Sequence, residues 1–171
     1  GNQVIFVEMK MRRELTILFL ALVLVVAGYA FNWAAQTVLR IYDYKSGEVY
    51  VEVPAKGGDK LFFGWIHSWE KIPWNEYYTI MPDNTIVLDS ISFPAFGAGI
   101  PENKGKVCRV ENGMIYMEEI GQVFPEFSWL NSHFATREII LNRQLISKGD
   151  MLPEHTRLRL VVERRFNKWL K

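Results

Sequence analysis

The chain has 171 residues, a formal net charge of +1, a 49% share of hydrophobic residues and one cysteine. The nearly balanced charge gives no electrostatic reason to expect nucleic acid as a partner. A single cysteine excludes a disulfide within this sequence, and it is too little for a soft-metal site.

The first predicted element is an uncharged run of 25 residues, 15–39, directly behind the basic residues Lys10, Arg12 and Arg13. As a helix at about 1.5 Å per residue, the run would reach roughly 37 Å. A bilayer core needs only about 30 Å. Because only Arg40 follows closely, the positive-inside bias predicts a cytoplasmic segment 1–14 and an extracytoplasmic remainder.

Two other interpretations of this run compete with a membrane span. A cleaved secretory signal has a similar basic front, but its apolar region spans only about 7–15 residues. Tyr29 and Trp33 stand where an aromatic belt at the outer interface would lie. The length and the lack of a polar stripe argue against a buried core helix. We therefore predict a transmembrane helix over 15–39 in the inner membrane, while cleavage stays open as an alternative.

After the run, hydrophobicity alternates with a period of two, which is typical of β-strands. Strands are predicted at 41–44, 48–53, 60–68, 76–81, 85–93, 106–110, 114–119, 122–130, 137–141 and 157–163. Asn112-Gly113 is a tight-turn signal because both residues tolerate positive φ. Pro125 interrupts one strand, which indicates an edge. The spacing predicts an all-β domain over 40–163, an antiparallel sandwich or barrel of roughly eight to ten strands.

The tail 164–171 mixes basic and aromatic residues. In a membrane-surface helix, its bases would contact lipid phosphates while Phe166, Trp169 and Leu170 entered the acyl boundary. A disordered terminus is the alternative.

The densest group of chemically capable side chains is His67, Ser68, Glu70, Trp74 and Glu76. His67 and Ser68 are neighbours, so in a strand they point to opposite faces and cannot form a nucleophile–base pair. No Gly-x-Ser-x-Gly elbow occurs in the sequence. The simplest role of His67 is a half-buried anchor for its loop. Glu76 opens a predicted strand between aromatic residues and is a candidate binding residue. The alternative is an edge carboxylate that caps a loop amide.

A second cluster contains Gly97, Gly99 and Pro101. The glycines suit positive φ or a close backbone approach, and a hard corner between two sheets is an equal alternative. We expect the loops 67–76 and 97–101 to converge on one side of the domain as a binding site. No His/Glu spacing typical of a metal site occurs, so no metal, cofactor or catalytic residue is predicted.

Several of these residues resemble a bacterial family of unknown function, numbered eighteen-fifty. The residues that carry the resemblance are His67-Ser68, Glu70-Lys71, Glu76-Tyr77 and Gly97-Ala98-Gly99-Ile100-Pro101. The similarity covers most of 39–162. The family has no established activity. Its members are often encoded beside the membrane subunits of TRAP-type transporters of the TAXI class, which take up organic acids with an ion gradient.

The resemblance implies an accessory role at such a transporter. We therefore expect a non-enzymatic, membrane-anchored protein whose partners are the membrane subunits or the substrate-binding protein of a TRAP-type transporter. A module that captures a small ligand between the two loops is the first alternative. A hydrolase is the second.

Overall fold

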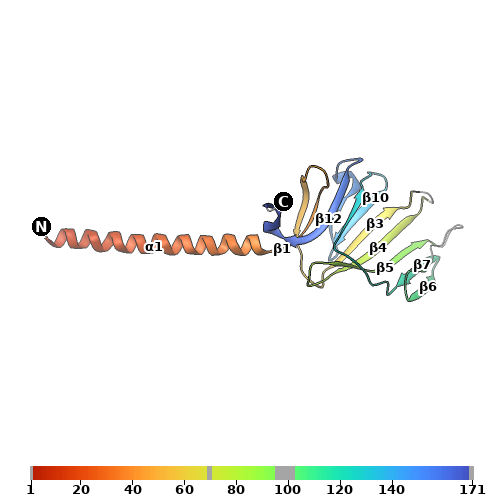
Figure 1. Cartoon of the computed structure of the whole chain (residues 1–171), viewed down its shortest axis with the longest axis horizontal. Coiled ribbons are helices and arrows are strands. Elements are labelled where there is room, and N and C mark those ends of the chain that lie inside the picture. Colours follow the sequence, from red (N-terminus) through yellow and green to blue (C-terminus); the bar gives the residue numbers. More distant parts are fainter. Residues whose placement is uncertain (1, 69–70, 95–102, 170–171) are drawn as a thin grey trace. The chain divides into compact units, whose positions relative to one another are not determined.

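A computed structural model of the chain describes residues 2–68, 71–94 and 103–169. The chain forms two units (Figure 1). One unit comprises Gly1–Gln36 together with Arg164–Lys171, and the other comprises Thr37–Glu163.

Helix α1 (Asn2–Ala35) is the helix of the first unit. Its segment Phe6–Ala35 is 30 residues long and apolar enough to cross a membrane. The predicted helix end at Leu39 is wrong, because strand β1 (Thr37–Asp43) already begins at Thr37. Val38 and Leu39 are fully buried within the β domain. An apolar run looks the same in a membrane helix and in a buried strand, so hydrophobicity alone could not place this boundary.

The tail forms a short 3-10 helix, η2 (Arg165–Trp169). The Arg165 guanidinium lies 4.4 Å above the Trp33 ring and donates to Gln36 Oε1 at 2.9 Å. Arg164 and Arg165 also donate to the carbonyl oxygens of Ala35 and Trp33. The last carbonyls of a helix lack partners within the helix, and cations are favoured beside them. The two arginines therefore cap the end of α1.

The β domain contains two antiparallel sheets, which confirms the predicted all-β sandwich. The four-stranded sheet has the order β2 (Val49–Pro54), β1, β12 (Arg157–Arg164) and β9 (Glu126–Leu130). The other sheet has the order β11 (Gln144–Lys148), β10 (Thr136–Leu141), β3 (Lys60–Ile66), β4 (Pro73–Ile80), β5 (Ile86–Pro94), β7 (Met114–Glu118) and β6 (Val107–Glu111). Strand β8 (Gln122–Phe124) also pairs with β5 and completes this eight-stranded sheet.

The core lies on the inner faces of the sheets, where apolar residues recur at every second position. In β12, Leu158, Leu160 and Val162 are buried, as the predicted alternation requires. The predicted strands 41–44 and 48–53 form an antiparallel hairpin, in which Ile41 pairs with Val51.

Three strand predictions are corrected by the structure. The predicted strand 122–130 divides at Pro125 into β8 and β9, which belong to different sheets. Proline cannot donate to a strand ladder, so the chain leaves one sheet there and joins the other. Strand β4 begins at Pro73, three residues before the predicted start at Glu76. Strand β11 was missed because its polar residues gave little hydrophobic signal.

Arg40 is a buried charge of the β domain, with 2% of its surface exposed. Its Nη2 lies 2.8 Å from Glu52 Oε2 of β2, and its Nη1 pairs with Glu163 of β12. Both neighbouring strands therefore supply a carboxylate to the same guanidinium. This arrangement ties together three strands of the four-stranded sheet.

Candidate ligand-binding site

Glu76 lies in the middle of β4, on the face that carries Trp74 and Tyr78. In the sheet register it lies opposite Phe63 of β3 and Ile91 of β5. Both of these neighbours are buried in the core. Because side chains alternate along a strand, this register directs the Glu76 carboxylate toward the interior of the sandwich. The alternative in which Glu76 is an edge carboxylate is therefore wrong, because β4 lies between β3 and β5.

The Glu76 carboxylate is held by neutral hydrogen-bond donors. The Tyr78 hydroxyl donates to its Oε2 at 2.7 Å. Burial raises the pKa of Glu76, while hydrogen bonds from Tyr78, Trp65 and Trp74 and the charge of Lys104 oppose that rise. Burial and the neighbouring Glu76 charge also raise the pKa of Tyr78. The surroundings of Glu76 thus disfavour its negative charge on balance.

A cavity of about 380 Å³ lies beside Glu76. Both sheets contribute to its lining, which includes Phe63, Trp65, Glu76, Tyr78, Phe127, Trp129 and Thr136. The aromatic rings meet across the interior of the sandwich. The Phe63 ring centroid lies 5.1 Å from that of Trp129, and the Tyr78 ring stacks on Phe127 at 5.4 Å. The volume falls within the range typical of small-molecule sites.

Trp129 lines this cavity and carries an unused donor. Its indole Nε1 is buried and meets no hydrogen-bond acceptor in the part of the chain that the structure describes. Leaving a buried donor unpaired costs about 1–3 kcal/mol. An acceptor atom on a bound molecule would remove that cost.

The structure brings three of the predicted site residues together through Trp65. The His67 ring stacks on Trp65 at 5.5 Å and lies 5.7 Å from Trp74. Trp65 and Trp74 also oppose the rise in the pKa of Glu76. His67 is half-buried and follows the end of β3, and its backbone N donates to the Ile72 carbonyl at 2.8 Å.

The remaining predicted site residues are Ser68, Glu70, Gly97, Gly99 and Pro101. Ser68 is exposed in the turn after β3. Glu70, Gly97, Gly99 and Pro101 lie outside the described residues. The convergence of the loops 67–76 and 97–101 therefore stays a prediction.

Sequence reasoning missed Trp65, Phe127 and Trp129. A signal for the inward direction of Glu76 was present, since Trp74, Glu76, Tyr78 and Ile80 share one parity in a single strand. Starting the strand at Glu76 concealed that pattern. No local signal could reveal that Trp129 lies across from Phe63, because the two residues belong to different sheets.

The site has the chemistry of a binding pocket, because it combines one carboxylate with several aromatic faces. Within residues 2–68, 71–94 and 103–169, no group of three or more His, Cys, Asp or Glu side chains could hold a metal ion.

The family model of the domain of unknown function DUF1850 matches residues 62–147. This match covers half of the chain and extends from β3 into β11. The chain belongs to the DUF1850 family. All the named cavity residues of this DUF1850 protein fall inside the matched segment. No curated protein and no solved structure matches the chain.

Proposed function

We propose that this DUF1850 protein is a membrane-anchored, non-enzymatic binding protein that holds a small organic cation between its sheets. The observation that carries the proposal is the inward-facing Glu76 carboxylate beside an aromatic cavity of about 380 Å³. Aromatic faces attract cations through their quadrupole, and the attraction grows when the cation is desolvated. A carboxylate in the same site adds a formal negative charge for an ammonium group.

The raised pKa of Glu76 fits this role. A cation favours the ionised carboxylate, which its surroundings otherwise disfavour, so binding and deprotonation support each other. The free N–H of Trp129 favours a ligand that also carries an acceptor oxygen. Choline combines both features and is a suitable probe.

The binding test uses the full chain in detergent micelles. Choline is titrated while tryptophan fluorescence is recorded, with 3,3-dimethylbutan-1-ol as the uncharged analogue of the same shape. We expect choline to bind and the neutral analogue to bind at least about tenfold more weakly. Equal binding of the two compounds, or no binding of choline, contradicts the proposal.

Glu76→Gln tests the residue itself, because it keeps the shape and removes the charge. We expect at least about tenfold weaker choline binding in this variant. The matched control is Glu119→Gln, which removes the same charge from an exposed position outside the cavity lining. Trp129→Phe keeps an aromatic ring and removes the N–H, so it should weaken choline more than tetramethylammonium, which has no acceptor.

The proposed setting is the outer face of the inner membrane. α1 has the length and composition of a membrane span, and Lys10, Arg12 and Arg13 favour a cytoplasmic start. A reporter that is active only outside the cytoplasm, fused after Lys171, should be active. Activity of a cytoplasm-only reporter at the same position would contradict this orientation.

The proposed partner is a TRAP-type transporter of the TAXI class, and the family resemblance is the support for it. The protein would act as an accessory to the membrane subunits or to the substrate-binding protein. Purification from native membranes in mild detergent should bring transporter subunits with the chain. Their absence from a preparation that retains other membrane complexes would exclude a stable association.

A further inference from the structure

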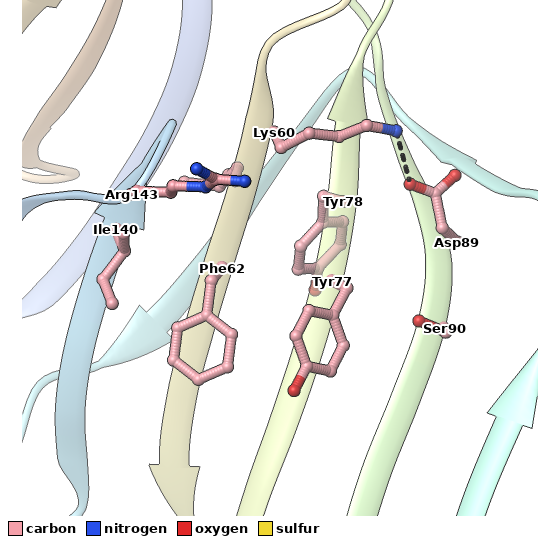
Figure 2. A pocket seen from close by; sticks show the side chains of 9 residues that line it. Lys60, Phe62, Tyr77, Tyr78, Asp89, Ser90, Ile140 and Arg143 are labelled. Atoms are coloured by element: carbon pink, nitrogen blue, oxygen red, sulfur yellow. Dashed lines mark ion pairs between the residues drawn. The ribbon is translucent and has the colours of Figure 1, made fainter.

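A second hollow, of about 610 Å³, lies on the eight-stranded sheet and carries different chemistry (Figure 2). Strands β3, β4 and β5 and the hairpin of β10 and β11 contribute its lining. The residues that matter here are Lys60, Phe62, Tyr77, Asp89 and Arg143. Phe62 and Tyr77 alternate with the buried Leu61 and Tyr78, so they stand on the outward face of the sheet. This outer groove is therefore distinct from the Glu76 cavity.

Phe62 and Tyr77 form the apolar part of the outer groove. They are directly opposite one another on β3 and β4, and their ring centroids lie 5.2 Å apart. Tyr77 is 39% exposed, and Figure 2 shows the two rings side by side. Such a pair is a platform for the apolar or aromatic body of a ligand.

Two of the three charged side chains in the groove, Lys60 and Asp89, pair with each other, and the third belongs to Arg143. Lys60 Nζ lies 3.7 Å from Asp89 Oδ2 and donates to Thr79 Oγ1. Arg143 forms no ion pair or side-chain hydrogen bond with the rest of the described chain. Figure 2 shows its side chain extending from the turn between β10 and β11 toward β3. The groove therefore presents one uncompensated cation next to an aromatic platform.

The backbone of Arg143 adopts positive φ, as several other turn residues of the chain do. Asn142 and Arg143 form the two-residue turn between β10 and β11, with φ of 48° and 69°. Positive φ at both positions is the pattern of a type I′ turn, whose second position favours glycine. Arginine at that position is disfavoured by steric strain, and such strain is concentrated at functional sites.

The same turn is held firmly against the groove. Lys60 N donates to Asn142 Oδ1 at 2.9 Å, and Asn142 N donates to the Lys60 carbonyl at 2.8 Å. These reciprocal bonds fix the turn to the start of β3. They also fix the backbone from which Arg143 extends.

We propose that the outer groove binds a small carboxylate whose apolar body rests on Phe62 and Tyr77 and whose carboxylate pairs with Arg143. A guanidinium matches a carboxylate with two parallel hydrogen bonds, which makes the recognition specific for that group. This site is independent of the proposed function, because it uses another face and the opposite ligand charge.

The test measures phenylacetate binding to the full chain in detergent by calorimetry, with empty micelles as the blank. Phenylacetamide is the neutral analogue of the same shape. We expect phenylacetate to bind and phenylacetamide to bind at least about tenfold more weakly. No binding of phenylacetate, or equal binding of the two compounds, would overturn the proposal.

Arg143→Gly is the decisive variant, because glycine relieves the turn while the guanidinium is lost. We expect an unchanged or higher melting temperature together with at least about tenfold weaker phenylacetate binding. Arg157→Gln, which removes the same charge from the other sheet, should bind phenylacetate normally. Unaltered binding in Arg143→Gly would overturn the proposal.

Two further measurements are needed. The first shows whether the outer groove and the Glu76 cavity bind independently, and the second shows whether the ligand of the outer groove is a small molecule or a protein. Glu76→Gln should leave phenylacetate binding unchanged, and Arg143→Gly should leave choline binding unchanged, so each site can fail alone. An acetylated Phe-Glu peptide amide stands for a carboxylate on a protein partner. If that peptide binds and phenylacetate does not, a small-molecule ligand is excluded.

Discussion

Arg40 and Glu76 are two charged side chains that point into the β domain. They differ in whether the protein supplies an opposite charge. Arg40 is 2% exposed and is paired with Glu52 and Glu163. Glu76 receives a hydrogen bond from Tyr78, and no cation of the described chain forms an ion pair with it. A charge that serves the fold is neutralised by the fold itself. A charge left without an opposite partner beside a cavity is available to a ligand.

The family match separates the same two regions. Glu76 lies inside the matched segment 62–147, whereas Arg40, Glu52 and Glu163 lie outside it. Strands β1, β2 and β12 therefore support the four-stranded sheet with residues beyond the segment that identifies the family.

The largest expected effect is at Arg40. Arg40→Ala leaves two carboxylates without their cation, so we expect the free energy of unfolding to fall by about 3–5 kcal/mol. Denaturant unfolding of the full chain in detergent, followed by the signal of the β domain, measures this. Arg109→Ala is the matched control, because Arg109 also pairs with two glutamates but is 41% exposed. Its loss should cost at most about 1 kcal/mol, and equal losses at both sites would erase the distinction.

Glu76→Gln should change stability in the opposite direction at neutral pH. Because the pKa of Glu76 is raised in the folded state, the native chain binds this proton more tightly than the unfolded chain. The stability associated with this group is thus complete below its ordinary pKa of 4.5 and is lost as pH rises through the raised pKa.

Glu76→Gln does not lose stability by deprotonation. Its melting temperature should therefore exceed that of the wild type at neutral pH and approach it near pH 4. Melting curves across this pH range test the sign. A variant that gains stability while it loses choline binding shows the trade-off typical of a functional site. A less stable variant at neutral pH would place Glu76 with Arg40, among the charges that serve the fold.

The smallest expected effect is at His67. Its ring contacts Trp65 and Trp74, so His67→Ala should lower the free energy of unfolding by about 0.5–1.5 kcal/mol. His67→Phe keeps a ring in this position and should recover most of that loss. If the phenylalanine variant is instead as unstable as the alanine variant, the ring nitrogens of His67 stabilise the fold through polar contacts. Choline binding of both variants separates that structural need from a role in the site.

Local sequence patterns were sufficient to predict the positions of most strands in the β domain. Most predicted strands agree with the structure because alternation reports a half-buried strand directly. The Asn112-Gly113 turn is present between β6 and β7, with positive φ at both residues. Pro125 marked an interruption correctly, although the change of sheet that it produces is a property of the whole sandwich.

By itself, the sequence determined the apolar helix, the antiparallel strands and the candidacy of Glu76, since composition and period-two alternation are local properties. The tertiary structure decided where the helix ends, because Val38 and Leu39 are buried only once β1 has joined its sheet. The tertiary structure also decided that the Trp129 ring contacts Phe63 and that Arg143 lines the outer groove. Alternation tells which residues share a face, but which faces meet depends on contacts between strands that are distant along the chain.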